Sequence, residues 1–347
     1  MIDSRGFAAL AEKTPLAPFS FQRRELLADD VLIDIHHCGV CHSDLHQLNN
    51  DWGGSHFPMV PGHEIVGRIA AVGSGVTRFK VGDAVGVGCM VDACHHCPNC
   101  ASGDEQFCET GFVRTYNDTD RHINGPTFGG YSNNIVVTES FVLRLPEHLD
   151  LAASAPLLCA GITTYSPLKR FGAGPGKKVG IAGLGGLGHV AIRLARALGA
   201  EVTLFTHSER KREDALRLGA HHVVLSSDKS ALRQQGGFDI ILDTISAAHD
   251  LNVWLRLLKK DGALVLVGIP EKSEDHAPVK AGNLIYQQRI LTGSFIGGIR
   301  ETQEMLDFCG EHNITCDVER LPLAEVNTAL ERLARNDVKY RFVLDMK

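Results

Sequence analysis

A short glycine string places the strongest constraint on the fold of this chain of 347 residues. The string follows an apolar strand-like run over residues 178–182 and precedes a helix-like run over 190–198. In this setting a G-x-G-x-x-G spacing makes a tight turn, lets a pyrophosphate approach the backbone, and allows the helix to pack closely on the strand. The string therefore predicts a dinucleotide site rather than an ordinary glycine-rich turn, formed by Gly183, Leu184, Gly185, Gly186, Leu187 and Gly188.

The sequence on either side of residue 170 differs in pattern. Downstream, apolar strand-like runs alternate with helix-like runs such as 210–218, which indicates a parallel sheet covered by helices on both faces. Upstream, short strand-like runs broken by glycine, such as 31–35 and 64–73, indicate a compact β-barrel or sandwich. The segment beyond residue 300 is expected to pack back on this first domain. The downstream strands are expected at 201–206, 222–225, 238–242, 263–267 and 290–293.

The residues after the run 201–206 lie where the adenosine ribose of a bound dinucleotide is expected. A site for NAD usually carries Asp or Glu there, whereas hydroxyl and basic side chains can bind the 2′-phosphate of NADP. NADP is therefore favoured, although Glu209 fits NAD and the basic residues also fit a solvated start of a helix. The candidate residues are Thr206, His207, Ser208, Arg210, Lys211 and Arg212.

Four of the ten cysteines lie within fifteen residues, in a C-x2-C-x2-C-x7-C pattern. In a chain of this size without a disulfide-rich composition, clustered thiols more often bind metal than form a disulfide framework. Four thiolates at this spacing can surround one tetrahedral Zn²⁺, although an iron–sulfur cluster uses similar spacing. Because four ligands close the coordination shell, we expect a structural site formed by Cys94, Cys97, Cys100 and Cys108.

Composition excludes several classes of function. Lys and Arg number 35 and Asp and Glu 41, giving a net charge of −6 without the broad positive field that nucleic acid or an anionic membrane requires. No apolar run approaches the roughly 20 residues of a membrane span. Residues 1–5 do not lead into the apolar segment of a secretory signal. We therefore expect a cytoplasmic protein with no nucleic-acid or membrane partner.

A second group of candidate ligands is scattered along the chain. Cys41 and His63 lie beside strand-like runs, and Cys159 lies near the start of the second pattern. Two cysteines and one histidine are a known catalytic zinc set, with a fourth position open to substrate. Spacing alone does not select these residues from ten cysteines and 17 histidines.

The chain as a whole resembles the zinc-dependent medium-chain alcohol dehydrogenases, most closely the cinnamyl-alcohol dehydrogenase branch with its bacterial NADPH-dependent aldehyde reductases. The passages that carry the resemblance are 38–46, 61–67, 157–165, 183–189 and 293–297. The resemblance implies an α/β protein with two domains. Residues 1–153 and 297–347 would form a GroES-like β-barrel catalytic domain, and residues 154–296 a Rossmann domain with a doubly wound parallel sheet.

The resemblance also assigns site residues. Cys41, His63 and Cys159 would hold a catalytic zinc, with Glu64 an occasional fourth ligand, and the four clustered cysteines would hold a structural zinc. The remaining cofactor-lining residues would be Thr244, Gly268, Ser294, Phe295 and Ile296. The segment 116–128 departs from the family pattern and carries several polar residues, which puts the substrate range in doubt but not the chemistry.

In the reaction this predicts, zinc polarises the carbonyl of an aldehyde and NADPH delivers a hydride. Ser43 would hydrogen-bond the substrate oxygen, and His46 would continue a proton relay to solvent. Asp44 either orients a metal ligand or caps a helix, and the sequence supports both roles equally. The expected substrates are aliphatic or aromatic aldehydes and their primary alcohols, and the expected assembly is a homodimer joined near residues 290–296.

Two alternatives remain at this point. Glu209 gives some support to an NAD-dependent polyol dehydrogenase. A non-catalytic, zinc-stabilised nucleotide-binding protein is the other alternative. The joint presence of Cys41, Ser43, His63 and Cys159 argues against it, because a protein without catalysis has no need of them together.

Overall fold

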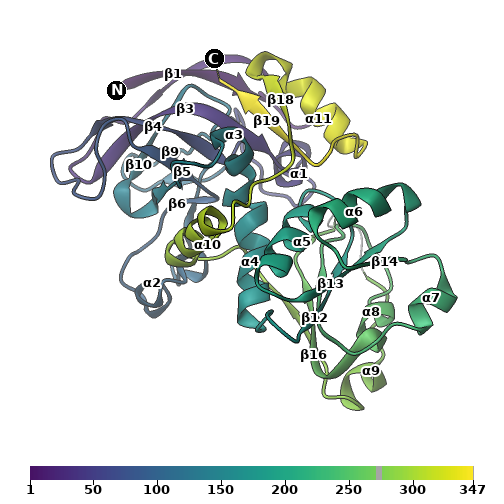
Figure 1. The fold of residues 1–347 in the computed structure, drawn as a ribbon. Coiled ribbons are helices and arrows are strands. Elements are labelled where there is room, and N and C mark those ends of the chain that lie inside the picture. Colours follow the sequence, from purple (N-terminus) through teal and green to yellow (C-terminus); the bar gives the residue numbers. More distant parts are fainter. Residues whose placement is uncertain (271–275, 347) are drawn as a thin grey trace. The chain divides into compact units, whose positions relative to one another are not determined.

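The chain divides into two compact units in the computed structural model, which describes residues 1–270 and 276–346 (Figure 1). One unit comprises Met1–Cys159 and Gly297–Lys347, and the other comprises Ala160–Ile296. The boundary expected after residue 153 lies earlier in the chain than this division. The reason is that the short 3₁₀ helix η3 (Ala155–Leu158) packs on strands of the first unit.

The first unit is built mainly from short strands, as its glycine-broken runs predicted. One sheet has the order β11-β5-β4-β3-β19-β18, with β10 also paired to β3, and β1 and β2 form a separate antiparallel pair. The strands are β1 (Ile2–Ala8), β2 (Ala17–Arg23), β3 (Asp30–Val40), β4 (Ile65–Val72), β5 (Ala84–Val87), β6 (Met90–Asp92), β7 (Val113–Arg114), β8 (Thr119–Asp120), β9 (Gly125–Pro126), β10 (Asn134–Thr138), β11 (Leu143–Arg144), β18 (Val318–Pro322) and β19 (Arg341–Asp345).

Strand β3 is the centre of this sheet and carries Ile33 and Ile35 into a fully buried core. It pairs antiparallel with β4, β10 and β19. Because Phe342 of β19 lies opposite Val40 at the end of β3, the C-terminal strand reaches the residues that follow β3. Figure 1 shows this yellow strand beside the purple β3, which confirms that the end of the chain returns to the first unit.

Among the helices of the first unit, α1 begins directly after Cys41. Its end is fixed by Asn50, whose left-handed backbone (φ 58°) lets its own amide donate to Gln47 O and the amide of Asp51 donate to His46 O. The helices are α1 (His42–Asn49), α2 (Pro98–Ser102), α3 (Leu151–Ser154), α10 (Ile299–Glu311) and α11 (Val326–Ala334), with the 3₁₀ turns η1 (Glu105–Phe107), η2 (Glu139–Phe141), η3 and η5 (Leu323–Glu325).

The second unit contains a six-stranded sheet with the order β14-β13-β12-β15-β16-β17, and every adjacent pair of strands is parallel. This is the strand order of a Rossmann fold, in which the direction of winding reverses between β12 and β15. Its elements are α4 (Ala160–Arg170), β12 (Lys178–Ala182), α5 (Gly188–Ala197), β13 (Glu201–Thr206), η4 (Glu209–Lys211), α6 (Arg212–Leu218), β14 (His222–Leu225), α7 (Lys229–Arg233), β15 (Phe238–Asp243), α8 (Asn252–Leu257), β16 (Leu258–Leu266), α9 (Ala281–Ile285) and β17 (Ile290–Gly293).

An aromatic cluster anchors the core of the second unit. The ring of Phe205 lies 5.4 Å from that of Phe238 and 5.1 Å from that of Trp254, measured between centroids. These residues come from β13, β15 and α8, so the cluster joins two strands to one covering helix. Because all three side chains are buried, their apolar area contributes strongly to the stability of this unit.

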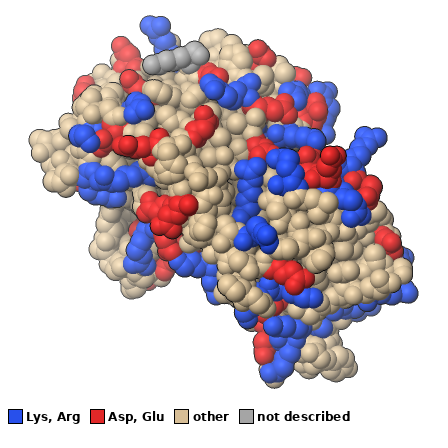
Figure 2. Space-filling view, in the orientation of Figure 1, with Lys and Arg blue, Asp and Glu red and all other residues tan. Residues whose placement is uncertain are grey.

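Acidic and basic side chains are interspersed over the visible surface of both units (Figure 2). This mixture agrees with the small negative net charge of the sequence. Among the helices of the described residues, none is both long enough and apolar enough to cross a membrane.

We expect Phe205→Ala to lower the free energy of unfolding by about 3–5 kcal/mol, because it removes the ring at the centre of the aromatic cluster and leaves a cavity. Urea denaturation followed by circular dichroism and by tryptophan fluorescence would measure the change. Leu216→Ala, at a half-exposed position of α6, is the control and should change this free energy by no more than about 0.5 kcal/mol. Equal effects of the two substitutions would contradict this account of the core.

Candidate metal centres and dinucleotide site

Cys41, His63, Glu64 and Cys159 meet in the first unit, although they are far apart in sequence. Each offers one ligand atom, these atoms all lie within 4.8 Å of one another, and all four residues are buried. The two sulfur atoms are 3.9 Å apart. Thiolates on one tetrahedral zinc lie about 3.8 Å apart, since each Zn–S bond is about 2.3 Å. The residues present therefore fit a zinc ion.

Asp44 binds the groups around this ligand set. One carboxylate oxygen accepts a hydrogen bond from Gly62 N (3.2 Å) and pairs with His63 Nδ1 (3.2 Å). The other oxygen accepts from Cys41 N (2.9 Å) and from the hydroxyl of Tyr131 (2.9 Å). With Nδ1 bound to Asp44, His63 has Nε2 left for a metal. Asp44 thus contacts the candidate ligand His63 and also forms the capping box of α1, so the structure is compatible with both roles that the sequence left open.

The electrostatics of the ligand set depend on Arg341, which sequence reasoning missed. Its guanidinium forms a fully buried ion pair with Glu64. Burial raises the pKa of the Glu64 carboxyl to about 8, against the opposing charge of Arg341. The hydrogen bond from the Cys159 thiol holds the pKa of Cys41 well below its ordinary value despite burial, and the charge of Arg341 lowers it further. Cys41 therefore favours the thiolate form that binds metal.

A further thiol, Cys89, which was not among the predicted site residues, also lies at this site. A hydrogen bond with Cys159 lowers the pKa of Cys89 despite its burial. Its carbonyl oxygen accepts from Thr115 N (3.2 Å), which places it next to the segment that carries Tyr116. No spacing in the sequence connects Cys89 with Cys159, so only the fold identifies it.

The two expected relay residues lie on α1. Ser43 Oγ is 3.6 Å from the sulfur of Cys41, at the ligand set. His46 Nδ1 pairs with Asp51 at 2.9 Å, and its ring lies against that of Trp52, with 4.8 Å between centroids. Asp51 was not among the predicted residues. Its position five residues after His46, just beyond the end of the helix, is a local signal that could have identified it.

The segment 116–128, which departs from the family pattern, begins beside the candidate ligand His63. The ring of Tyr116 stacks on that of His63, with centroids 5.9 Å apart and an interplanar angle of 27°. Asn117, with a left-handed backbone (φ 55°), accepts a hydrogen bond from His56 N and donates one to the side chain of Gln47. The segment then forms the short β8–β9 hairpin. Its first residues therefore shape the surroundings of His63.

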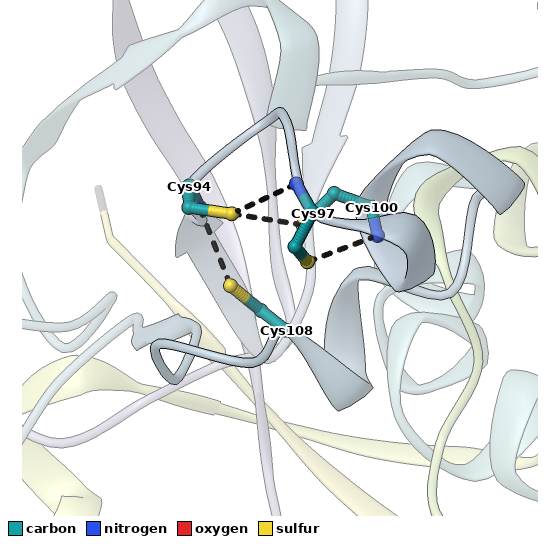
Figure 3. A group of neighbouring side chains, drawn as sticks. All are labelled: Cys94, Cys97, Cys100 and Cys108. Atoms are coloured by element: carbon teal, nitrogen blue, oxygen red, sulfur yellow. Dashed lines mark hydrogen bonds between the residues drawn. The ribbon is translucent and has the colours of Figure 1, made fainter.

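The four clustered cysteines form the second group (Figure 3). Their sulfur atoms lie within 4.8 Å of one another, and those of Cys94 and Cys100 are 3.8 Å apart. Backbone amides turn inward and donate to the sulfurs of Cys94, Cys97 and Cys108. Burial alone would raise the pKa of Cys108, but hydrogen bonds with Thr110 and the amide of Cys94 lower it to about 6. The group suits a cation with four thiolate ligands.

The glycine string connects β12 to α5, as its pattern predicted. Gly183 has a left-handed backbone (φ 94°), and a Cβ on Gly188 would collide with the carbonyl oxygen of Gly183. A Cβ on Gly185 would meet nothing within 4 Å, so this side of the loop is open. Thr244, a predicted cofactor residue, binds the loop directly, because its hydroxyl donates to Ala182 O at 2.8 Å.

The basic residues after β13 have different partners. Arg212 forms an ion pair with Glu209 and also donates to Val223 O. Lys211 is half-buried, and its Nζ donates to Leu184 O of the glycine string at 2.6 Å. Desolvation lowers the pKa of Lys211, and no carboxylate in the described part of the chain forms an ion pair with it. Arg210 is exposed, and Ser208 N donates to the hydroxyl of Thr206. Lys211 therefore has the charge best placed for an anion at the loop.

The other predicted cofactor residues follow β16 and β17. A Cβ on Gly268 would collide with Ile245 O, so the chain requires glycine at this close approach. Ser294 N donates to Leu266 O at 3.1 Å, which continues the pairing of the two strands. Phe295 is half-exposed, whereas Ile296 is buried with a positive φ of 35°. His207 lies exposed at the end of β13.

Comparisons with known proteins agree with this architecture. Residues 27–147 match the alcohol dehydrogenase GroES-like domain, and residues 186–311 match the zinc-binding dehydrogenase family. The chain is 53% identical to NADP-dependent alcohol dehydrogenase C 1 of Mycolicibacterium smegmatis, over 98% of this chain and 97% of that protein. It is 52% identical to aldehyde reductase YahK of Escherichia coli, with the same coverage.

A solved structure supports the same assignment. Cinnamyl alcohol dehydrogenase of Helicobacter pylori, complexed with NADP(H), superposes with a TM-score of 0.93 and is 44% identical, covering 99% of this chain and 98% of that one. The match spans both units. The chain therefore belongs to the zinc-dependent medium-chain alcohol dehydrogenases, a family of oxidoreductases, and within it to the cinnamyl-alcohol dehydrogenase branch.

Proposed function

We propose that this protein is a two-zinc, NADP(H)-dependent reductase of aldehydes that also oxidises the corresponding primary alcohols. The observation that carries the proposal is the convergence of Cys41, His63 and Cys159 in one buried site, with Glu64 held by Arg341. Three strong donors with an open fourth position are the ligand set of a catalytic zinc, whereas the four-cysteine group is the ligand set of a structural zinc. The names of the relatives support the substrate class and the preference for NADP.

When bound, zinc supplies a Lewis acid that polarises a carbonyl oxygen, and NADPH supplies a hydride. The residues of the chain provide the proton that the reduced oxygen needs. Ser43 carries a hydroxyl 3.6 Å from the sulfur of Cys41 and can donate to the substrate oxygen. His46, whose Nδ1 is held by Asp51, can pass a proton onward to solvent, and alcohol oxidation uses the same groups in reverse.

The dinucleotide site of the second unit favours NADP over NAD through Lys211. Among the described residues, the half-buried Lys211 ammonium binds a carbonyl oxygen and pairs with no carboxylate, so it gains from an anionic partner such as the 2′-phosphate. Ser208 and Arg210 would complete the phosphate site. Glu209, the residue that favoured NAD, pairs with Arg212 and so has its charge neutralised locally.

We also propose a cytoplasmic homodimer that acts on small molecules. Among the described residues of the second unit, β17 is the outermost strand of its sheet, and no strand of theirs pairs with its outer edge. Ile285, Tyr286 and Ile290 are large apolar side chains exposed beside this edge. Exposed apolar groups next to an open strand edge favour pairing with a second copy.

His63→Ala should reduce the zinc content from two ions per chain to one and lower aldehyde reduction by about a thousand-fold, since the Lewis acid is worth several kcal/mol. Metal analysis and NADPH oxidation with a panel of aldehydes would measure both, and NADPH binding should be retained. His222→Ala, at an exposed position, is the matched control. A single zinc in the wild-type protein, unaltered activity of the variant, or a preference for polyols with NAD would refute the proposal.

For the cofactor, we expect Lys211→Ala to raise the KM for NADPH about 10- to 100-fold, which corresponds to the loss of one charged hydrogen bond. The KM for NADH should change little, because NADH lacks the 2′-phosphate. Steady-state kinetics with both cofactors provide the measurement, with Lys260→Ala as an exposed control in the same unit. An equal rise for both cofactors would mean that Lys211 only supports the glycine string.

For the assembly, Ile290→Lys should convert a dimer into a monomer, because it places charge at the outer edge of the sheet. Light scattering coupled to size-exclusion chromatography would give the mass of each species. Leu216→Lys, which adds the same charge to α6, should leave the mass unchanged. A dimer that persists in Ile290→Lys would place the interface elsewhere.

A further inference from the structure

Tyr131 connects the segment before β10 to the metal centre of the first unit. Its side chain is fully buried, and its hydroxyl donates to Asp44 at 2.9 Å. The other oxygen of the same carboxylate binds His63 Nδ1. Burial raises the pKa of the Tyr131 phenol well above its ordinary value, so the hydroxyl keeps its proton and acts as the donor. A single carboxylate therefore lies between a phenol and a proposed zinc ligand.

The backbone around Tyr131 is fixed against the turn that ends in His63. Tyr131 N donates to Pro61 O at 2.9 Å, Gly130 N to Gly62 O at 2.9 Å, and Gly129 N to Val60 O at 2.7 Å. A Cβ on Gly129 would collide with the carbonyl oxygens of the same turn, so the close approach requires glycine there. These hydrogen bonds hold the segment 129–131 against the turn 60–62.

A buried arginine holds this segment from its other side. The guanidinium of Arg23 donates to Phe128 O at 2.8 Å, to Gly129 O at 3.1 Å and to the hydroxyl of Ser132 at 3.0 Å. Burial lowers the pKa of the Arg23 guanidinium to about 9. Burying a cation costs free energy, and the three hydrogen bonds of Arg23 offset part of that cost. Arg23 therefore helps to hold the segment 128–132 in place.

We propose that Tyr131 is a positioning residue that fixes the orientation of His63 through Asp44. The inference rests on the proposed function, in which His63 binds the catalytic zinc. Asp44 accepts four hydrogen bonds, two on each oxygen, and a carboxylate offers about four lone-pair directions. Loss of the phenol hydroxyl leaves one oxygen of the fully buried carboxylate with a single donor, so the carboxylate shifts and the imidazole loses its fixed orientation.

The test is Tyr131→Phe in the full-length holoenzyme, because this change removes the hydroxyl and keeps the buried ring. We expect zinc at the Cys41–His63–Cys159 site to bind about 10- to 100-fold more weakly in competition with a chelator. Zinc at the four-cysteine site should be retained as in the wild type, and it serves as an internal control. The absorption spectrum of the protein with cobalt at the catalytic site should also change, because it reports ligand geometry.

Two further variants separate positioning from packing. Tyr165→Phe removes the hydroxyl of another buried tyrosine, in the second unit, and should leave zinc retention unchanged. Asp44→Asn removes the charge through which Tyr131 acts, so adding Tyr131→Phe to it should cause little further loss of zinc affinity. A double variant whose losses simply add would overturn the proposal, because Tyr131 would then act independently of Asp44.

The failure of this inference is distinguishable from failure of the proposed function. If the wild type holds one zinc ion, the function proposed above fails. If the wild type holds two and Tyr131→Phe retains both as tightly, with an unchanged cobalt spectrum, only the role of Tyr131 is overturned. Equal loss of zinc from both sites, with a lowered melting temperature, would identify Tyr131 as a packing residue and would also overturn it.

Discussion

The buried carboxylate of Asp44 is the constraint on which the geometry of the first unit depends. An uncompensated carboxylate in a dry interior costs several kcal/mol, and Asp44 is fully buried. Its partners are two backbone amides, one imidazole and one phenol, drawn from three separate segments. Because two of these segments carry proposed zinc ligands, satisfying the carboxylate also fixes the ligands. The start of α1, the turn before β4 and the segment before β10 are thereby held together.

The fold could be predicted because its signals are local. The glycine string lies between a strand and a helix, and the alternation that follows it predicts the parallel sheet of the second unit. The four clustered cysteines are equally local, since ligands within fifteen residues need no distant partner to meet. Spacing in the sequence therefore sufficed to predict both the glycine string and the four-cysteine group, and the structure brings the members of each together.

The residues around the candidate ligands Cys41, His63 and Cys159 had no local signal in the sequence. Arg341 reaches Glu64 only because β19 pairs with the end of β3, and Tyr131 reaches Asp44 only because its segment lies on the turn before β4. Even the ligand set was nominated by family resemblance and not by spacing. In the second unit, too, a contact between neighbours in sequence could be predicted and a contact between distant residues could not. Glu209 and Arg212, three residues apart, could be paired from the sequence, but the contact of Lys211 with Leu184 could not.

Arg341 also distinguishes the proposed catalytic zinc site from the proposed structural one. The Glu64 carboxylate lies within reach of the other three ligands, so it is available as a fourth donor. Arg341 binds one of its oxygens, and burial raises the pKa of Glu64 to about 8. Both effects oppose a free carboxylate at the metal and favour a three-donor set with an open position. The four-cysteine group offers four sulfur donors within reach of one another, so a zinc bound there would have a closed coordination shell.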